Sequence, residues 1–185
     1  MMFRLVLTTL IICLFGIQKP VAQQLSVEKV RDQFFSMSNS EDGALKLFKS
    51  LEKADLAKNP ILLAYRGASS AASAGSVSGV RKKIEYFNNG KEEIEKAVKL
   101  KPLDAEIRFL RLATQVSAPG FLGYTGDIKA DKEIIIMTLG STAADHPNAY
   151  LYQRICSFML KYVKLNPTEK STVSQFVVKF TPKQK

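Results

Sequence analysis

The sequence predicts an all-α protein of about seven to eight helices, in antiparallel pairs stacked on one another. Apolar residues recur with helical spacing along most of the chain, as Val27, Val30 and Phe34 do near its start. Junctions that contain proline separate one such segment from the next. The stretches KAVKLKP (96–102) and KYVKLNP (161–167) are near copies. A repeated junction of this kind is typical of stacked helix pairs, in which neighbours complete each other's core.

The first 22 residues have the pattern of a secretory signal peptide. Arg4 gives a positive start, residues 5–17 form an apolar run, and Ala22 offers a small residue for cleavage. The apolar run is short for a membrane span. An uncleaved membrane anchor and lipid attachment at Cys13 are the alternatives. We therefore expect residues 1–22 to be removed and the protein to be exported, as a periplasmic or secreted bacterial protein.

The remaining chain has the length of one domain. We expect a single helical, repeat-like domain over 23–180 and a disordered basic tail over 181–185. After the signal peptide, no stretch is long and apolar enough to predict a transmembrane span. Without residues 1–22, 25 basic side chains stand against 17 acidic ones, a net charge of +8. This charge favours acidic partners, such as another envelope protein or an anionic ligand or lipid headgroup, or reflects only a soluble lysine-rich surface. No nucleic-acid partner is expected for an exported protein.

In the first half of the chain, helical segments follow one another with short breaks. The expected helices cover 25–37, 40–57, 59–74 and 80–101. Asn59 and Pro60 form a helix start, because asparagine caps the backbone and proline fits the first turn. The helix after them is rich in Ala, Ser and Gly, which lets another helix backbone approach closely. Within the fourth segment, Asn88-Asn89-Gly90 is a turn signal between two apolar faces.

The second half continues the pattern. The expected helices cover 104–117, 127–141, 146–165 and 167–180. Asp104 caps the first of these, and Asn166 with Pro167 and Glu169 starts the last. The isoleucine run 134–136 also fits a strand, but we favour a helix. A proline and three glycines predict a loop over 117–127.

The stretch EEIEKAVKLKPLDAEIRF (92–109) resembles the junction between two tetratricopeptide repeats. One helix ends in an alanine, a leucine and Pro102, and the next begins at once. This resemblance implies a tetratricopeptide-like right-handed array of helix pairs. It is confined to these residues, since no full repeat of the family's length fits the rest of the chain.

A broader resemblance links residues 59–140 to a family of exported bacterial envelope proteins with no assigned activity. The residues that carry it are Tyr65-Arg66-Gly67-Ala68, Tyr86-Phe87 with Gly90, the run Glu106 to Arg111, and Phe121-Leu122-Gly123-Tyr124 with Asp131. The resemblance implies a recurring helical domain and no particular chemistry. Tyr65 and Arg66, at the start of this region, are further candidate binding residues.

Two arginines interrupt the apolar stretch EIRFLRLATQ. On a helix that starts at Asp104, the side chains of Asp104, Arg108, Arg111 and Gln115 share one narrow face between apolar residues. A partly buried arginine needs a partner. The partner is either internal, with Asp104 for Arg108 and Glu106 or an acid on a neighbouring helix for Arg111, or a carboxylate or phosphate ligand held in a helical groove.

The loop 117–127 is the second candidate binding site. Phe121 and Tyr124 lie among its glycines. Exposed, they would anchor a partner, because buried aromatic side chains dominate binding energy. Tucked inward, they would plug the end of the domain, which is the interpretation we favour.

The sequence argues against most catalytic and metal chemistry. With one histidine, His146, and one cysteine after residue 22, Cys156, a His/Cys zinc site cannot be built. We expect His146 to have a capping or surface role and Cys156 to be a buried, inert thiol. There is no G-x-S-x-G and no phosphate-binding G-K-[ST] motif. We therefore expect no enzyme and no cofactor. The expected function is a binding or scaffold module, or alternatively a carrier or sensor of a small anionic ligand or lipid.

Overall fold

The computed structural model describes residues 26–52, 56 and 58–181. In these residues the chain forms eight α-helices and two short 3-10 helices and no strand, which confirms the all-α prediction. The predicted signal peptide and all but the first residue of the predicted tail lie outside the described residues. The isoleucine run that also fitted a strand is helical.

Three helices begin where the capping residues predicted. Asn59 and Asn166 each accept a backbone N–H hydrogen bond in the first turn, and Glu169 completes a reciprocal capping box with Asn166. Asp104 accepts two such bonds. The bounds are α1 Val27–Ser36, η1 Met37–Asn39, α2 Gly43–Leu51, α3 Pro60–Ser73, α4 Val80–Leu100, α5 Ala105–Ser117, η2 Gly120–Leu122, α6 Ile128–Ser141, α7 Ala149–Tyr162 and α8 Pro167–Lys179.

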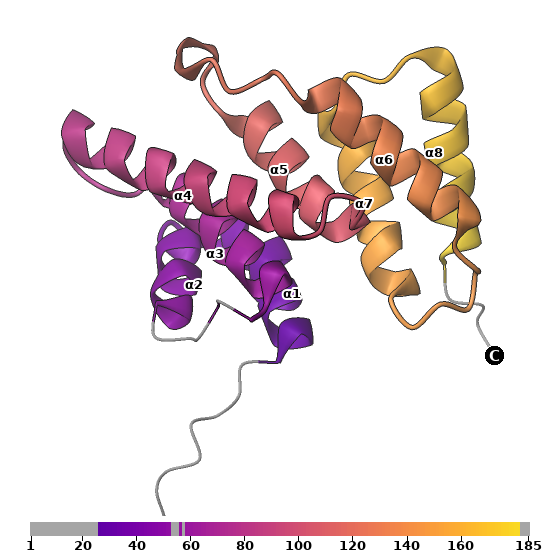
Figure 1. The fold of residues 1–185 in the computed structure, drawn as a ribbon, viewed down its shortest axis with the longest axis horizontal. Coiled ribbons are helices and arrows are strands. Elements are labelled where there is room, and N and C mark those ends of the chain that lie inside the picture. The colour runs from indigo at the N-terminus through magenta and orange to yellow at the C-terminus, as the bar shows by residue number, and fades with distance from the viewer. Residues whose placement is uncertain (1–25, 53–55, 57, 182–185) are drawn as a thin grey trace, which may run out of the picture.

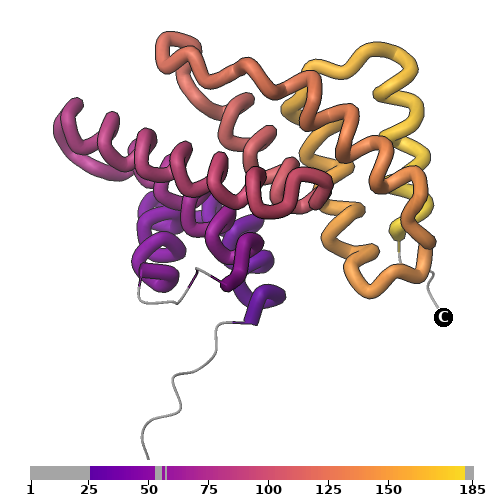
Figure 2. Tube along the Cα trace, viewed as in Figure 1, coloured from indigo at the N-terminus to yellow at the C-terminus, as the bar shows by residue number. Residues whose placement is uncertain are grey.

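Consecutive helices pack as pairs, and the pairs are joined through α5. α3 packs on α4, α5 on α6, and α7 on α8, while α5 also contacts α3, α4 and α7. In Figures 1 and 2, α1 to α4 lie on one side of α5 and α6 to α8 on the other. The tetratricopeptide-like handedness of this stacking stays a prediction.

One apolar core runs through the whole described fold. It begins at Val30 on α1 and ends at Phe180 after α8. α5 supplies its centre, with Ile107, Phe109 and Leu110 fully buried. Because α5 is covered by helices from both halves of the chain, the two halves share one core. None of the helices in the described residues has the length and apolar character needed to cross a membrane.

The predicted turn at Asn88-Asn89-Gly90 is wrong, because α4 continues unbroken through it. Gly90 lies where α4 crosses the small-residue helix α3. A Cβ atom added at Gly67 would come within 2.7 Å of the Gly90 carbonyl oxygen, and Ser70 Oγ donates a 2.9 Å hydrogen bond to the Tyr86 carbonyl. The glycine therefore permits close helix packing, a role that local turn statistics do not distinguish from a chain reversal.

Candidate functional site

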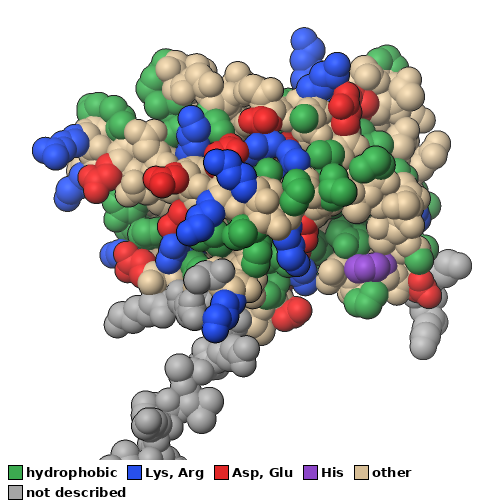
Figure 3. Space-filling model, in the orientation of Figure 1, with side chains coloured by type: hydrophobic (Ala, Val, Ile, Leu, Met, Phe, Trp, Pro, Cys, Tyr) green, Lys and Arg blue, Asp and Glu red, His purple; other side chains and the backbone are tan. Residues whose placement is uncertain are grey.

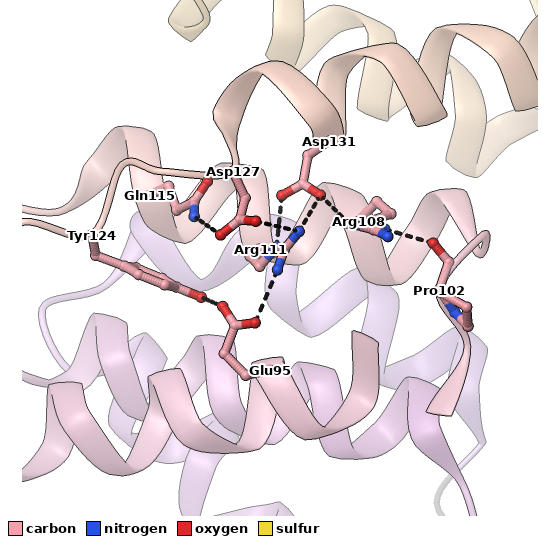
Figure 4. A network of polar contacts seen from close by, with 8 residues as sticks. All are labelled: Glu95, Pro102, Arg108, Arg111, Gln115, Tyr124, Asp127 and Asp131. Atoms are coloured by element: carbon pink, nitrogen blue, oxygen red, sulfur yellow. Dashed lines mark hydrogen bonds and ion pairs between the residues drawn. The ribbon is translucent and has the colours of Figure 1, made fainter. Parts of the chain in front are cut away.

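The two arginines that interrupt the apolar stretch project from α5 toward α6. Arg111 forms a two-pronged ion pair with Asp131, in which Nε and Nη2 each lie 2.8 Å from a carboxylate oxygen. Its remaining nitrogen, Nη1, donates to Glu95 of α4 at 2.9 Å. Figure 4 shows the guanidinium group enclosed by these carboxylates. Every nitrogen of the Arg111 guanidinium therefore has an internal acceptor.

Arg108 joins the same cluster from one turn earlier. Its Nη1 donates to Asp131 at 2.9 Å, and its Nε donates to the carbonyl of Pro102 at 2.7 Å. The expected Asp104–Arg108 pair is not found among the described residues. Asp104 instead accepts hydrogen bonds from the N–H groups of Glu106 and Ile107 as the helix cap. The cap at the start of α5 thus uses the carboxylate that helical spacing had assigned to Arg108.

The loop after α5 contributes a buried tyrosine to the cluster. Tyr124 donates to Glu95 at 2.7 Å and packs edge-on against Phe87, with ring centroids 5.9 Å apart. Phe121, three residues earlier, is 86% exposed. The favoured plug interpretation therefore fits Tyr124 and fails for Phe121. Phe121 lies within the 3-10 helix η2, whereas Tyr124 follows Gly123 at its end.

The cluster is rich in charge for its depth in the protein. Asp131 is fully buried, and Asp127 lies 3.3 Å from Arg111, so two arginines meet three carboxylates. Burial alone would lower the pKa of Arg111, but its hydrogen bonds to Asp131 and the charges of Asp131, Glu95 and Asp127 raise that pKa above its ordinary value. Burial and the Glu95 carboxylate raise the pKa of Tyr124. Both groups thus keep their protons at physiological pH.

A second buried cluster was not predicted. Arg31 of α1 donates two hydrogen bonds of 2.7 Å to Glu106 of α5, and Tyr65 of α3 donates to the same carboxylate at 2.8 Å. Arg31 also donates to Asn148, which precedes α7, at 3.0 Å. This cluster ties α1, α3, α5 and α7 together. Its partners are far apart in sequence, so helical spacing could not reveal it.

Arg31 and Tyr65 of this second cluster also have raised pKa values. The hydrogen bonds to Glu106 raise the pKa of Arg31, and burial raises the pKa of Tyr65. Tyr65 is fully buried. The candidate binding residue Tyr65 is therefore held inside the fold by Glu106, which the sequence had assigned as one possible partner of Arg111.

Arg66 lies apart from both clusters. It forms a two-pronged, partly exposed ion pair with Glu93 of α4, at 3.0 and 2.7 Å. This pair borders a shallow groove of about 360 Å³ between α3 and α4 that mixes charges of both signs. The structure thus distributes the six candidate binding residues over four places. Arg108, Arg111 and Tyr124 meet, whereas Tyr65, Arg66 and Phe121 are separate.

The remaining titratable candidates have structural roles. Cys156 is fully buried, and burial raises the pKa of its thiol to about 12. His146 Nδ1 accepts a hydrogen bond of 3.0 Å from the backbone N–H of Asn148. Across the part of the chain that the structure describes, no group of three or more His, Cys, Asp or Glu side chains is placed to hold a metal ion.

The charges of the interior are arranged as pairs that hold helices together. The geometry agrees with the internal-partner interpretation of Arg108 and Arg111, with Asp131 of α6 as the shared acceptor.

Comparisons of the chain with protein-family models, with curated proteins and with solved structures found no match.

Proposed function

We propose that this protein is a non-catalytic binding or scaffold module of the bacterial cell envelope that acts through its outer surface. One observation carries the proposal: the arginines Arg108 and Arg111 are engaged by internal carboxylates, while large apolar side chains remain exposed. Phe121, Val80 and Leu103 are 86%, 74% and 64% exposed. Export and a tetratricopeptide-like stacking of the helix pairs are parts of the proposal, supported by the apolar first segment and by the repeated junction sequence.

The engaged arginines weigh against the alternative of a small-anion carrier. To hold a carboxylate or phosphate, Arg111 would have to exchange Asp131 or Glu95 for the ligand. Asp131 would then remain fully buried with only Arg108 beside it. Taking one of its two cations from a buried carboxylate is costly, so a ligand on the outer surface is favoured over one in this cluster.

A pull-down tests the proposal. Tagged protein comprising residues 23–185 is incubated with a detergent-solubilised bacterial envelope extract, washed at low and at moderate salt, and the bound proteins are identified by mass spectrometry. The control bait is an unrelated helical protein of similar net charge. We expect one stoichiometric partner that survives the salt wash and is missing from the control. A mixture lost with salt, or shared with the control bait, would contradict a specific module.

A further inference from the structure

The start of α4 and the loop around η2 both lie at the exposed edge of the molecule. In Figure 1, the start of α4 extends at the left beyond the helices that pack on it, and the loop that carries η2 lies above α4 at the upper left. Val80 and Ile84 of α4 are 74% and 44% exposed, and Phe121 of η2 is 86% exposed. We call these three apolar side chains, together with Arg81, Lys82 and Lys83, the α4 end.

The apolar part of the α4 end continues a buried stripe. Val80, Ile84 and Phe87 follow helical spacing and share a face of α4. Phe87 is buried against Tyr124 and Ala71 in a small cluster separate from the main core. This cluster anchors both α4 and the loop, and it ends before Ile84 and Val80. The α4 end is therefore a firmly supported projection that leaves its last apolar side chains uncovered.

The basic part of the α4 end carries an excess of positive charge. Arg81, Lys82 and Lys83 are consecutive and exposed, and Glu85 is the one acid between Val80 and Phe87. Among the described residues, the ion pairs include none that engages these three cations. This differs from the interior, where each guanidinium discussed above meets carboxylates. Figure 3 shows blue and green side chains at the left end of the molecule, with red ones beside them.

The shape and composition of the α4 end fit a lipid surface better than a protein. A stable protein interface buries roughly 800 Å² on each partner around a core depleted of charge. Here three consecutive cations spread around the first turn of a projecting helix, beside its exposed apolar side chains. At a bilayer surface, apolar side chains enter the boundary of the acyl chains, while lysine and arginine contact anionic headgroups.

We propose that the α4 end docks this protein on the surface of an anionic phospholipid bilayer. Phe121, Val80 and Ile84 enter the headgroup region, and Arg81, Lys82 and Lys83 bind lipid phosphates. The inference rests on the proposed function, because it assigns a partner class to one part of the outer surface. It leaves the opposite end, formed by α7 and α8, available to a protein partner.

Vesicle flotation tests the proposal. Every described helix follows residue 25, so protein comprising residues 23–185 retains the whole core and lacks the apolar first segment, which would itself bind lipid. It is mixed with phosphatidylcholine vesicles with or without about 30% phosphatidylglycerol. The test variant carries Arg81→Glu, Lys82→Glu and Lys83→Glu. Its control carries Lys161→Glu, Lys164→Glu and Lys170→Glu, which changes the net charge equally at exposed positions of α7, α8 and the segment between them.

We expect the parent protein to float with the anionic vesicles only. Each basic side chain near an anionic surface strengthens binding about fivefold, and each glutamate adds repulsion, so the α4-end variant should bind at least about 100-fold more weakly than the parent. The control variant should lose much less. Phe121→Ser should weaken binding about tenfold, whereas Met137→Ser, at a 60% exposed position of α6, should not. Melting curves establish that each variant is folded.

Two outcomes would overturn the proposal. Equal losses in the two triple variants would show that net charge alone attracts the lipid. Failure of the parent protein to bind anionic vesicles would exclude bilayer docking. If the pull-down still yields a salt-resistant protein partner in that case, the proposed function stands and only the lipid assignment fails. If the partner is then lost in the α4-end variant, the same surface binds a protein.

Discussion

The helix pairs α3–α4 and α5–α6 are neighbours in the fold but are joined in opposite ways. Where α3 meets α4, the backbones approach so closely at Gly67 and Gly90 that no side chain fits between them. Where α5 meets α6, Arg108 and Arg111 reach across to Asp131, which is fully buried. The α3–α4 contact leaves no room for side-chain atoms between the two backbones. In the α5–α6 contact, paired charged side chains fill the space between the helices.

This difference predicts how each pair fails. A small-residue crossing gains its stability from dense packing, so it tolerates no added volume. A buried ion pair is no sure source of stability, but it becomes a liability when one partner is removed, because the other charge is then buried alone. α6 buries Ile135 and Leu139 in the core, and Ile128 and Ile136 pack against it partly buried. Asp131 is the third buried residue of α6, so its ion pairs add to an apolar contact.

The largest effect is expected from removing one charged side chain of the α5–α6 contact. Arg111→Ala would leave the buried Asp131 with only Arg108, at a cost of about 3–5 kcal/mol and a fall in melting temperature of about 10 °C. Circular dichroism melting measures it. Arg66→Ala is the control, since the Arg66–Glu93 pair is partly exposed and contributes less than about 1 kcal/mol. An Arg111→Ala protein that melts like its parent would instead indicate a binding role for this arginine.

Adding one methyl group at Gly90 tests the close contact between α3 and α4. Gly90→Ala would normally favour a helix, yet here the new Cβ would lie 2.5 Å from the backbone nitrogen of Ala71. We expect a loss of about 1–3 kcal/mol in the free energy of unfolding, measured by urea denaturation. Gly140→Ala in α6 is the matched control, because its Cβ would meet only Phe176 at 3.7 Å. That variant should be unchanged or up to about 1 kcal/mol more stable. If both substitutions stabilised the protein, the close crossing would be refuted.

A partly exposed ion pair sharpens the contrast with the buried one. Lys132 of α6 lies 2.8 Å from Glu169 of α8. Desolvation would raise the pKa of the Glu169 carboxyl, but the Lys132 ammonium and the Asn166 N–H lower it below its ordinary value. A lowered folded-state pKa stabilises the protein above the unfolded-state pKa of about 4.3, and this contribution is lost as the pH falls through the folded-state value.

Glu169→Gln should therefore melt about 2 °C below the parent at neutral pH, and the difference should shrink toward pH 3. Melting curves over this pH range measure it. A difference that stays constant with pH would mean that the carboxylate charge does not stabilise the α6–α8 contact.

The smallest expected effect is at Cys156, which reports on the whole fold. Its thiol is buried, with a pKa of about 12, so iodoacetamide should not label it in the native protein at neutral pH. In protein comprising residues 23–185 it is the single cysteine. Labelling should appear only as the protein unfolds, at the same denaturant concentration as the loss of helix. Labelling of Cys156 in the Arg111→Ala protein before its helix signal falls would show that the core around α7 opens before the helices unfold.

Local sequence patterns predicted the helices and several of their starts. Asn59, Asp104 and Asn166 cap helices where they were expected to, because a cap is made by residues within one turn of one another. The isoleucine run and the small-residue helix were likewise helical. The turn at Gly90 was predicted wrongly, since a glycine that breaks a helix and one that admits a neighbouring helix look the same in sequence.

The candidate site was predicted in part. The narrow polar stripe between apolar residues predicted that Arg108 and Arg111 are partly buried. It also predicted that each needs a partner. The identity of the partner did not, because Asp131 is 20 residues from Arg111 and Glu106 binds Arg31, 75 residues away. The same limit applies to Phe121 and Tyr124, which share one loop and face opposite environments.

By itself, then, the sequence determined the helical fold class, the capped helix starts and the charge balance, since these depend on neighbouring residues and on composition. Only the tertiary structure decided which carboxylate each arginine binds, which glycine marks a crossing and which apolar side chains stay exposed. Those features depend on distances between helices that are far apart along the chain, and helix periodicity fixes which face a residue lies on, not what that face meets.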